Sequence, residues 1–69
     1  MTLYEMLALI FAADRAQGGC SVEITTINIP PSGIEMTGYV KFGLLGVTRA
    51  FSGRHELRKV LEELDREPV

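Results

Sequence analysis

The sequence contains few of the residues that usually reinforce a small domain. It has one cysteine, Cys20, and one histidine, His55, among 69 residues. A single cysteine excludes a disulfide within one chain, and a cysteine and a histidine this far apart match no zinc-ligand spacing. We therefore expect no metal and no cofactor. A lone thiol also suits a reducing compartment, which indicates a cytoplasmic protein.

The sequence also lacks an excess of positive charge and a long hydrophobic run. Seven basic residues stand against nine acidic ones, for a net charge of −2. This balance argues against general nucleic-acid binding, although it leaves room for a local basic patch. The apolar run over residues 3–13 is interrupted by Glu5 and follows no Lys or Arg. Because about 20 apolar residues are needed to span a bilayer, we expect a soluble helix here and no membrane segment.

A chain of 69 residues has room for one domain, over residues 1–69, with one small core. Folding at this size buries only about 60% of the surface that the unfolded chain exposes. Small domains are therefore often reinforced by disulfides, metals or a second subunit. Since the first two are excluded or disfavoured, the sequence predicts a homodimer.

The first helix is predicted from its cap and its apolar spacing. Thr2 and Glu5 have the spacing of a capping box, and Gly18-Gly19 is typical of a helix end. The apolar residues expected on one side are Leu3, Met6, Leu7, Ile10 and Ala13. The other side is mostly alanine, so this helix is more apolar than one buried face requires. We expect it to contact something on two sides.

Three strands are predicted next, over residues 21–29, 34–42 and 47–51. Residues 34–42 alternate between apolar and polar side chains, which indicates a sheet with one buried and one wet face. A turn at residues 30–33 pairs Ile27 with Met36 and Ile29 with Ile34, all on the core face. With this pairing, the apolar side chains in the first half of strand 21–29 fall on the face opposite the core. Either a bulge lies near Thr25, or that half faces the other side; a bulge is favoured.

The turn at residues 43–46 sets the register of the third strand. It places Val47 opposite Phe42 and Phe51 opposite Gly38, where the ring covers bare backbone. Val47 and Phe51 are expected in the core. Arg49 falls in the same row, so it must lie at the sheet edge or find a carboxylate.

The last helix begins after Ser52, a good N-cap, and has one apolar stripe. The stripe consists of Leu57, Val60, Leu61 and Leu64. The predicted fold is therefore α+β in the order α-β-β-β-α, a three-stranded antiparallel meander with two helices packed on one face.

Four residues are candidates for contact with a partner protein. Leu44 and Leu45 occupy a turn where polar residues are usual, so they either cover the core or form the rim of an interface. Tyr39 is the one large anchor on the polar face of the sheet, and Arg49 is a cation that needs a partner.

The start of the last helix carries a basic cluster of Arg54, His55, Arg58 and Lys59. Arg58 and Lys59 can form i,i+4 pairs with Glu62 and Glu63. Alternatively, the cluster and the helix start could bind a phosphate or a carboxylate. The element order also resembles that of double-stranded-RNA-binding domains, which implies contact with backbone phosphates through this helix.

We expect a non-enzymatic protein-binding module, such as an adaptor, accessory subunit or inhibitor, that self-associates. The chain is short for a walled active site, and the sequence supplies His55 with no orienting group beyond Glu56. The alternative is a nucleic-acid-binding protein that uses the basic start of the last helix.

Overall fold

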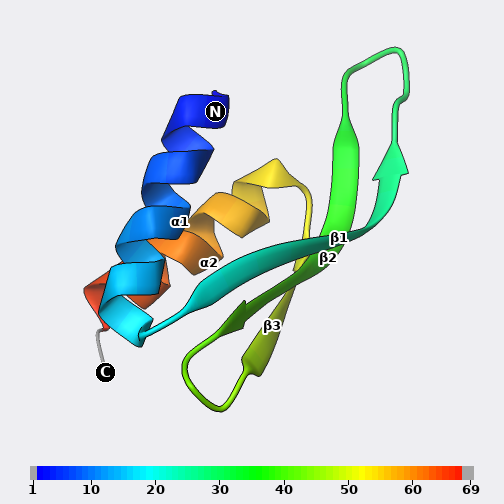
Figure 1. Ribbon diagram of the computed structural model, residues 1–69. Coiled ribbons are helices and arrows are strands. Elements are labelled where there is room, and N and C mark those ends of the chain that lie inside the picture. The colour runs from blue at the N-terminus through cyan, green and yellow to red at the C-terminus, as the bar shows by residue number, and fades with distance from the viewer. Residues whose placement is uncertain (1, 68–69) are drawn as a thin grey trace.

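The computed structural model describes residues 2–67 and has the predicted α-β-β-β-α order. The elements are α1 (Leu3–Gln17), β1 (Cys20–Asn28), β2 (Glu35–Phe42), β3 (Val47–Ser52) and α2 (Arg54–Arg66). The strands form one antiparallel sheet in the order β1-β2-β3, as a simple meander requires. Figure 1 shows both helices on one face of this sheet.

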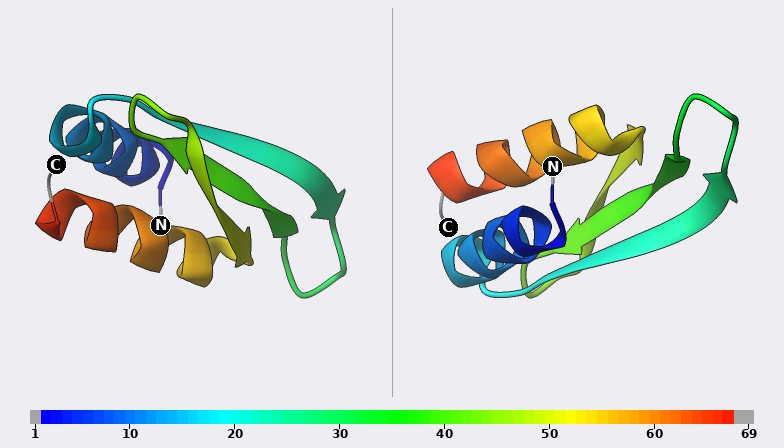
Figure 2. Two further views of the ribbon diagram at one scale, coloured as in Figure 1. Left: turned by 90° about the horizontal axis from the view of Figure 1, so that it is seen from below. Right: turned by 90° about the horizontal axis from the view of Figure 1, so that it is seen from above.

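The two helices cover different parts of this face. α1 packs along α2 and, within the sheet, mainly on β1, whereas α2 packs on β3 and β2. Both views of Figure 2 place α1 with β1 along one side of the molecule and α2 with β3 along the other. The chain is elongated, with principal extents of 40 × 21 × 14 Å.

The ends of α1 are formed as the sequence predicts. The Thr2 hydroxyl accepts a hydrogen bond from the Glu5 N–H at 3.1 Å. Gly18 adopts a left-handed conformation, with φ of 75°, and its N–H donates to the Asp14 carbonyl. The second glycine, Gly19, donates to the same carbonyl. Glycine reaches this conformation at little cost, so the pair ends the helix sharply.

The predicted bulge is present in β1. The register with β2 shifts between Ile24 and Thr26, and Ile27 lies opposite Met36 as expected. The Thr25 hydroxyl donates to the Thr37 carbonyl beside the shift. Because of this extra residue, the apolar residues on both halves of β1 lie on the core face of the sheet, with Val22 opposite Val40 and Ile27 opposite Met36.

The register of β2 and β3 is also confirmed. Phe42 lies opposite Val47, Val40 opposite Arg49, and Gly38 opposite Phe51. The Phe51 side chain is buried in the core.

The core is small and is centred on α2. Its buried residues are Ala13, Met36, Val40, Phe51, Leu57, Val60, Leu61 and Leu64. The predicted stripe of α2 is therefore confirmed in full. Buried Gln17 joins the helices, because its side-chain amide donates to the carbonyls of Leu64 and Glu67 at the end of α2.

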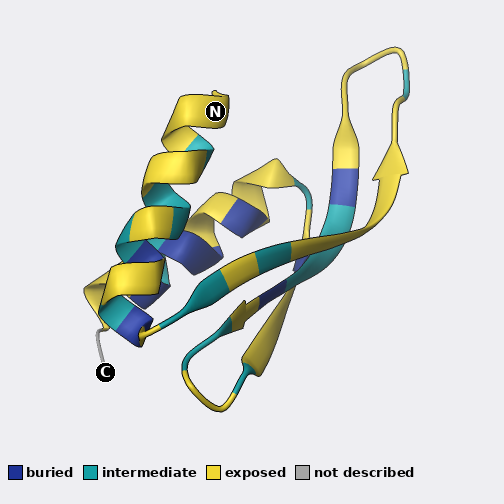
Figure 3. Cartoon of the chain, in the orientation of Figure 1, coloured by how far each residue is buried: buried dark blue, intermediate teal, exposed yellow. Residues whose placement is uncertain are grey.

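The predicted core of the sheet is too large. Ile27, Ile29, Ile34 and Val47 were expected to be buried, and all four are exposed. For the three isoleucines the reason is the reach of the helices, because the outer half of the β1–β2 hairpin projects past them, as Figures 1 and 3 show. Val47 lies at the other end of the sheet, beside the turn between β2 and β3.

Two predictions about the helices are also wrong in detail. Met6, Ile10 and Ala13 of the predicted α1 stripe pack on the core, whereas Leu3 and Leu7 are exposed. Ser52 is the last residue of β3 and does not cap α2. Gly53 takes the N-cap position and makes no side-chain capping bond. No helix in the described part of the chain is long and apolar enough to cross a membrane.

Candidate protein-interaction surfaces

The outer side of α1 carries a row of exposed apolar side chains, which we call the α1 ridge. It consists of Leu3, Tyr4, Leu7 and Phe11. Positions 3, 7 and 11 are spaced by four residues, so they follow one side of the helix, beside the side that carries Met6, Ile10 and Ala13 toward the core. The four ridge side chains are exposed within the described part of the chain.

The projecting hairpin exposes four isoleucines, the arm isoleucines. They are Ile24, Ile27, Ile29 and Ile34. Ile24 lies opposite Gly38 and Ile27 opposite Met36, which is in the core. Because directly opposed residues share a face of the sheet, Ile24 and Ile27 continue the core face beyond the helices.

The turn between β2 and β3, the leucine turn, spans residues 43–46. Gly43 and Gly46 have positive φ angles of 78° and 68°, which expose the two residues between them. Leu44 and Leu45 are 93% and 95% exposed, so they do not cover the core of this chain. With the end of α1, including Arg15, they line an open hollow of about 590 Å³.

Tyr39, on the polar face of the sheet, is hydrogen-bonded to a residue of the same chain. Its hydroxyl donates to the Glu23 carboxylate on the neighbouring strand. This hydrogen bond, and then the negative charge of Glu23, raise the pKa of Tyr39. A shallow hollow of about 410 Å³ beside them is lined by Lys41 and Thr48 among others.

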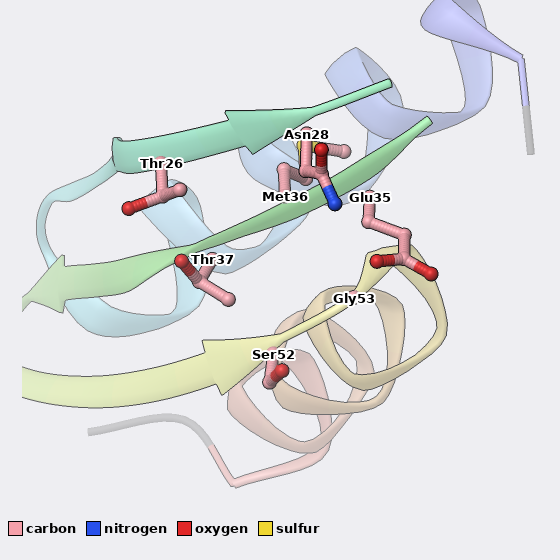
Figure 4. A pocket seen from close by; sticks show the side chains of 7 residues that line it. All are labelled: Thr26, Asn28, Glu35, Met36, Thr37, Ser52 and Gly53. Atoms are coloured by element: carbon pink, nitrogen blue, oxygen red, sulfur yellow. The ribbon is translucent and has the colours of Figure 1, made fainter. Parts of the chain in front are cut away.

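A further hollow of about 340 Å³ lies where the arm meets the start of α2, and sequence reasoning did not find it (Figure 4). Its lining consists of Thr26, Asn28, Glu35, Met36, Thr37, Ser52 and Gly53. These residues come from β1, β2 and β3 and the start of α2, so no local sequence pattern brings them together. Glu35 is the single charged group among them.

Ion pairs occupy part of the basic cluster on α2. Arg58 pairs with Glu62 at 2.9 Å, as predicted, and Arg66 also reaches Glu62 at 3.5 Å. Glu63, the expected partner of Lys59, pairs instead with Arg49 at 2.8 Å. The carboxylate that Arg49 requires therefore comes from the facing helix.

Arg54, His55 and Arg58 come together in an open hollow at the start of α2. Its volume is about 380 Å³, and Glu35 lies among its lining residues. Three of the four residues of the predicted cluster thus line one hollow with a carboxylate, whereas Lys59 lines a neighbouring hollow with Glu62 and Glu63. The negative charge of Glu35 opposes the binding of an anion.

Cys20 lies half-buried at the beginning of β1, where its N–H donates to the Asp14 carboxylate at 3.0 Å. Burial, and then the charge of Asp14, raise the pKa of the thiol.

Within residues 2–67 no three His, Cys, Asp or Glu side chains gather as metal ligands would. Comparison of the chain with known protein families, curated proteins and solved structures found no match.

Proposed function

We propose that this protein is a non-enzymatic protein-binding module that self-associates as a homodimer. The main support for the proposal is how many large apolar side chains are exposed, compared with how many are buried, among the described residues. Eleven large apolar residues are exposed, whereas eight residues form the core. Single exposed apolar residues are ordinary, but contiguous groups mark interaction surfaces.

The exposed residues are grouped and lie on an extended shape. They form the α1 ridge, the arm isoleucines and the leucine turn with Val47. The radius of gyration is 11.9 Å, against about 11 Å for a compact domain of this length. The surface of a second protein would cover the apolar side chains that the helices and sheet of this chain leave exposed.

Two observations support a binding role over catalysis. The hollows lined by His55 contain no serine, threonine or cysteine that a histidine base could activate. The raised thiol pKa of Cys20 makes it a weak nucleophile near neutral pH.

We infer a reducing compartment such as the cytoplasm for the protein, since Cys20 is its single cysteine.

Sedimentation equilibrium tests self-association directly. We expect a mass twice the 7.6 kDa of one chain at high protein concentration. The mass should fall toward that of one chain on dilution. A mass of one chain at every concentration would exclude the homodimer.

Nucleic-acid binding is the second candidate, and the ion pairs of Arg49 and Arg58 weigh against it. Retention on duplex RNA or DNA that falls with salt, and that is lost in Arg54→Glu/Arg58→Glu, would favour it over a purely protein-binding role. Lys41→Glu is the matched charge control on the opposite face of the sheet.

A further inference from the structure

Two features that need a partner lie on the same side of the molecule. The α1 ridge is exposed along the outer side of α1, and β1 is the first strand of the sheet, with one edge unpaired. The views in Figures 1 and 2 agree that α1 and β1 lie together on this side, with α2 packed against α1 and β3 at the opposite edge of the sheet.

The edge of β1 is only partly protected against pairing. Natural edge strands are usually blocked by lysine, proline, a bulge or short length. β1 has nine residues and contains no lysine, arginine or proline. Its bulge between Ile24 and Thr26 limits the regular edge to residues 20–24, where the Cys20 N–H already donates to Asp14. Its one charged residue, Glu23, accepts a hydrogen bond from Tyr39. The opposite edge, β3, has six residues and carries Arg49.

We propose that a second copy of this chain pairs with the first through β1, and that the two α1 ridges pack against each other. Residues 20–24, the regular part of β1 before the bulge, form the antiparallel pair. The result is a six-stranded sheet with four helices on one face. This inference rests on the proposed self-association and names the surface that mediates it.

A single twofold axis brings together both the β1 edges and the α1 ridges of the two copies. Two identical strands that pair antiparallel are related by an axis perpendicular to the sheet, and this axis keeps both copies' helices on the same face. Since α1 lies over β1 in each copy, the two α1 helices become neighbours across the axis. Each then receives the second apolar contact that its outer side lacks.

The exposed area reaches the lower end of the range for a stable dimer. The side chains of the α1 ridge and Ile24, which lie at the proposed contact, are between 40% and 87% exposed. At about 200 Å² for a fully exposed large apolar residue, they present roughly 600 Å² per copy, or about 1,200 Å² for two copies. Stable interfaces bury about 1,200–2,000 Å² in total.

The helix contact is tested by Leu7→Glu and Phe11→Glu, measured by sedimentation. Both residues are exposed within the chain, so each variant should keep the far-UV circular dichroism of the folded protein. Burying a charge in the helix contact should weaken the dimer at least about 30-fold. The control, Thr48→Glu at an exposed position on the polar face of β3, should dimerise as the unmodified chain does.

The strand contact is tested by amide hydrogen exchange. Exchange of residues 20–24 should slow when the protein is concentrated from monomer to dimer, while exchange in β3 stays unchanged. Exchange that slows in β3 instead would place the pairing on the other edge and overturn the proposal.

The outcomes separate this inference from the self-association on which it rests. An unmodified chain that stays monomeric contradicts both. A dimer that survives Leu7→Glu and Phe11→Glu, and shows no added protection in β1, leaves self-association standing and excludes this surface.

Discussion

Gly38 illustrates how one residue can be required by two neighbouring strands. On one side it lies opposite Phe51, and this pairing follows from the sequence alone. On the other side, a Cβ at position 38 would collide with the Glu23 carbonyl beside the bulge. The second constraint depends on how closely β1 approaches β2, which no sequence pattern records.

Gly38→Ala should therefore destabilise the fold by about 1–3 kcal/mol, the usual cost of forcing an extra group into a packed site. Chemical denaturation would measure this change. Thr48→Ala, on the exposed polar face, is the control and should change stability by less than about 0.5 kcal/mol. Equal stability of the two variants would contradict the close approach of β1.

Cys20 is the second residue whose behaviour follows from its surroundings. Burial and the Asp14 carboxylate raise its thiol pKa, so at neutral pH it should alkylate more slowly than a free thiol. Asp14→Asn keeps an oxygen acceptor for the Cys20 N–H and removes the negative charge. In this variant the pKa of the Cys20 thiol should fall, so the thiol should be alkylated faster at a fixed pH.

The pH dependence of the alkylation rate measures both quantities. Glu5→Gln removes a carboxylate from the other end of α1 and should leave the rate unchanged. A rate that rises equally in both variants would show that the contact with Asp14 has no role.

At the scale of elements, the two helices differ in how far the chain covers them. The charged side of α2 faces solvent, and its four apolar residues form the centre of the core. α1 buries Ala13 and Gln17 fully and leaves its ridge exposed. Most of the stability of the isolated chain should therefore come from α2 and the strands beneath it.

Paired leucine substitutions test this division. Leu61→Ala removes a fully buried side chain and should cost about 2–5 kcal/mol of stability. Leu45→Ala makes the same chemical change at an exposed position and should cost less than about 0.5 kcal/mol. Thermal or denaturant unfolding of both variants measures the contrast. A large loss for Leu45→Ala would show that the leucine turn contacts the core.

At the scale of the whole molecule, one sheet is too long for the two helices above it. The arm extends beyond both helices and keeps its isoleucines exposed (Figure 3). In the proposed dimer a second copy covers the α1 ridge and the edge of β1. Stability would then include the free energy of association as well as the packing within one chain.

The unfolding temperature should therefore rise with protein concentration, because mass action favours the folded dimer. Differential scanning calorimetry over a range of concentrations would show the shift. Leu7→Glu should remove the concentration dependence. An unfolding temperature that is constant for the unmodified chain would indicate that folding needs no second subunit.

Several long-range features could be predicted because local patterns constrain them strongly. The bulge in β1 follows from parity, and the pairing of Gly38 with Phe51 follows from the length of the leucine turn. The need of Arg49 for a carboxylate was also predictable, since an unpaired charge in an apolar row is costly. Its partner, Glu63, was not predictable, because it depends on how α2 crosses β3.

The sequence by itself determined the order of the elements and the register of β2 with β3, and it favoured the bulge that puts the apolar residues of β1 on one side. Alternation and turn length act over a few residues, so they specify these properties without tertiary structure. Only the tertiary structure decided which apolar residues are covered, and it left Ile27, Val47 and Leu7 exposed. Coverage depends on the length and crossing of the helices relative to the sheet, and periodicity carries no information about either.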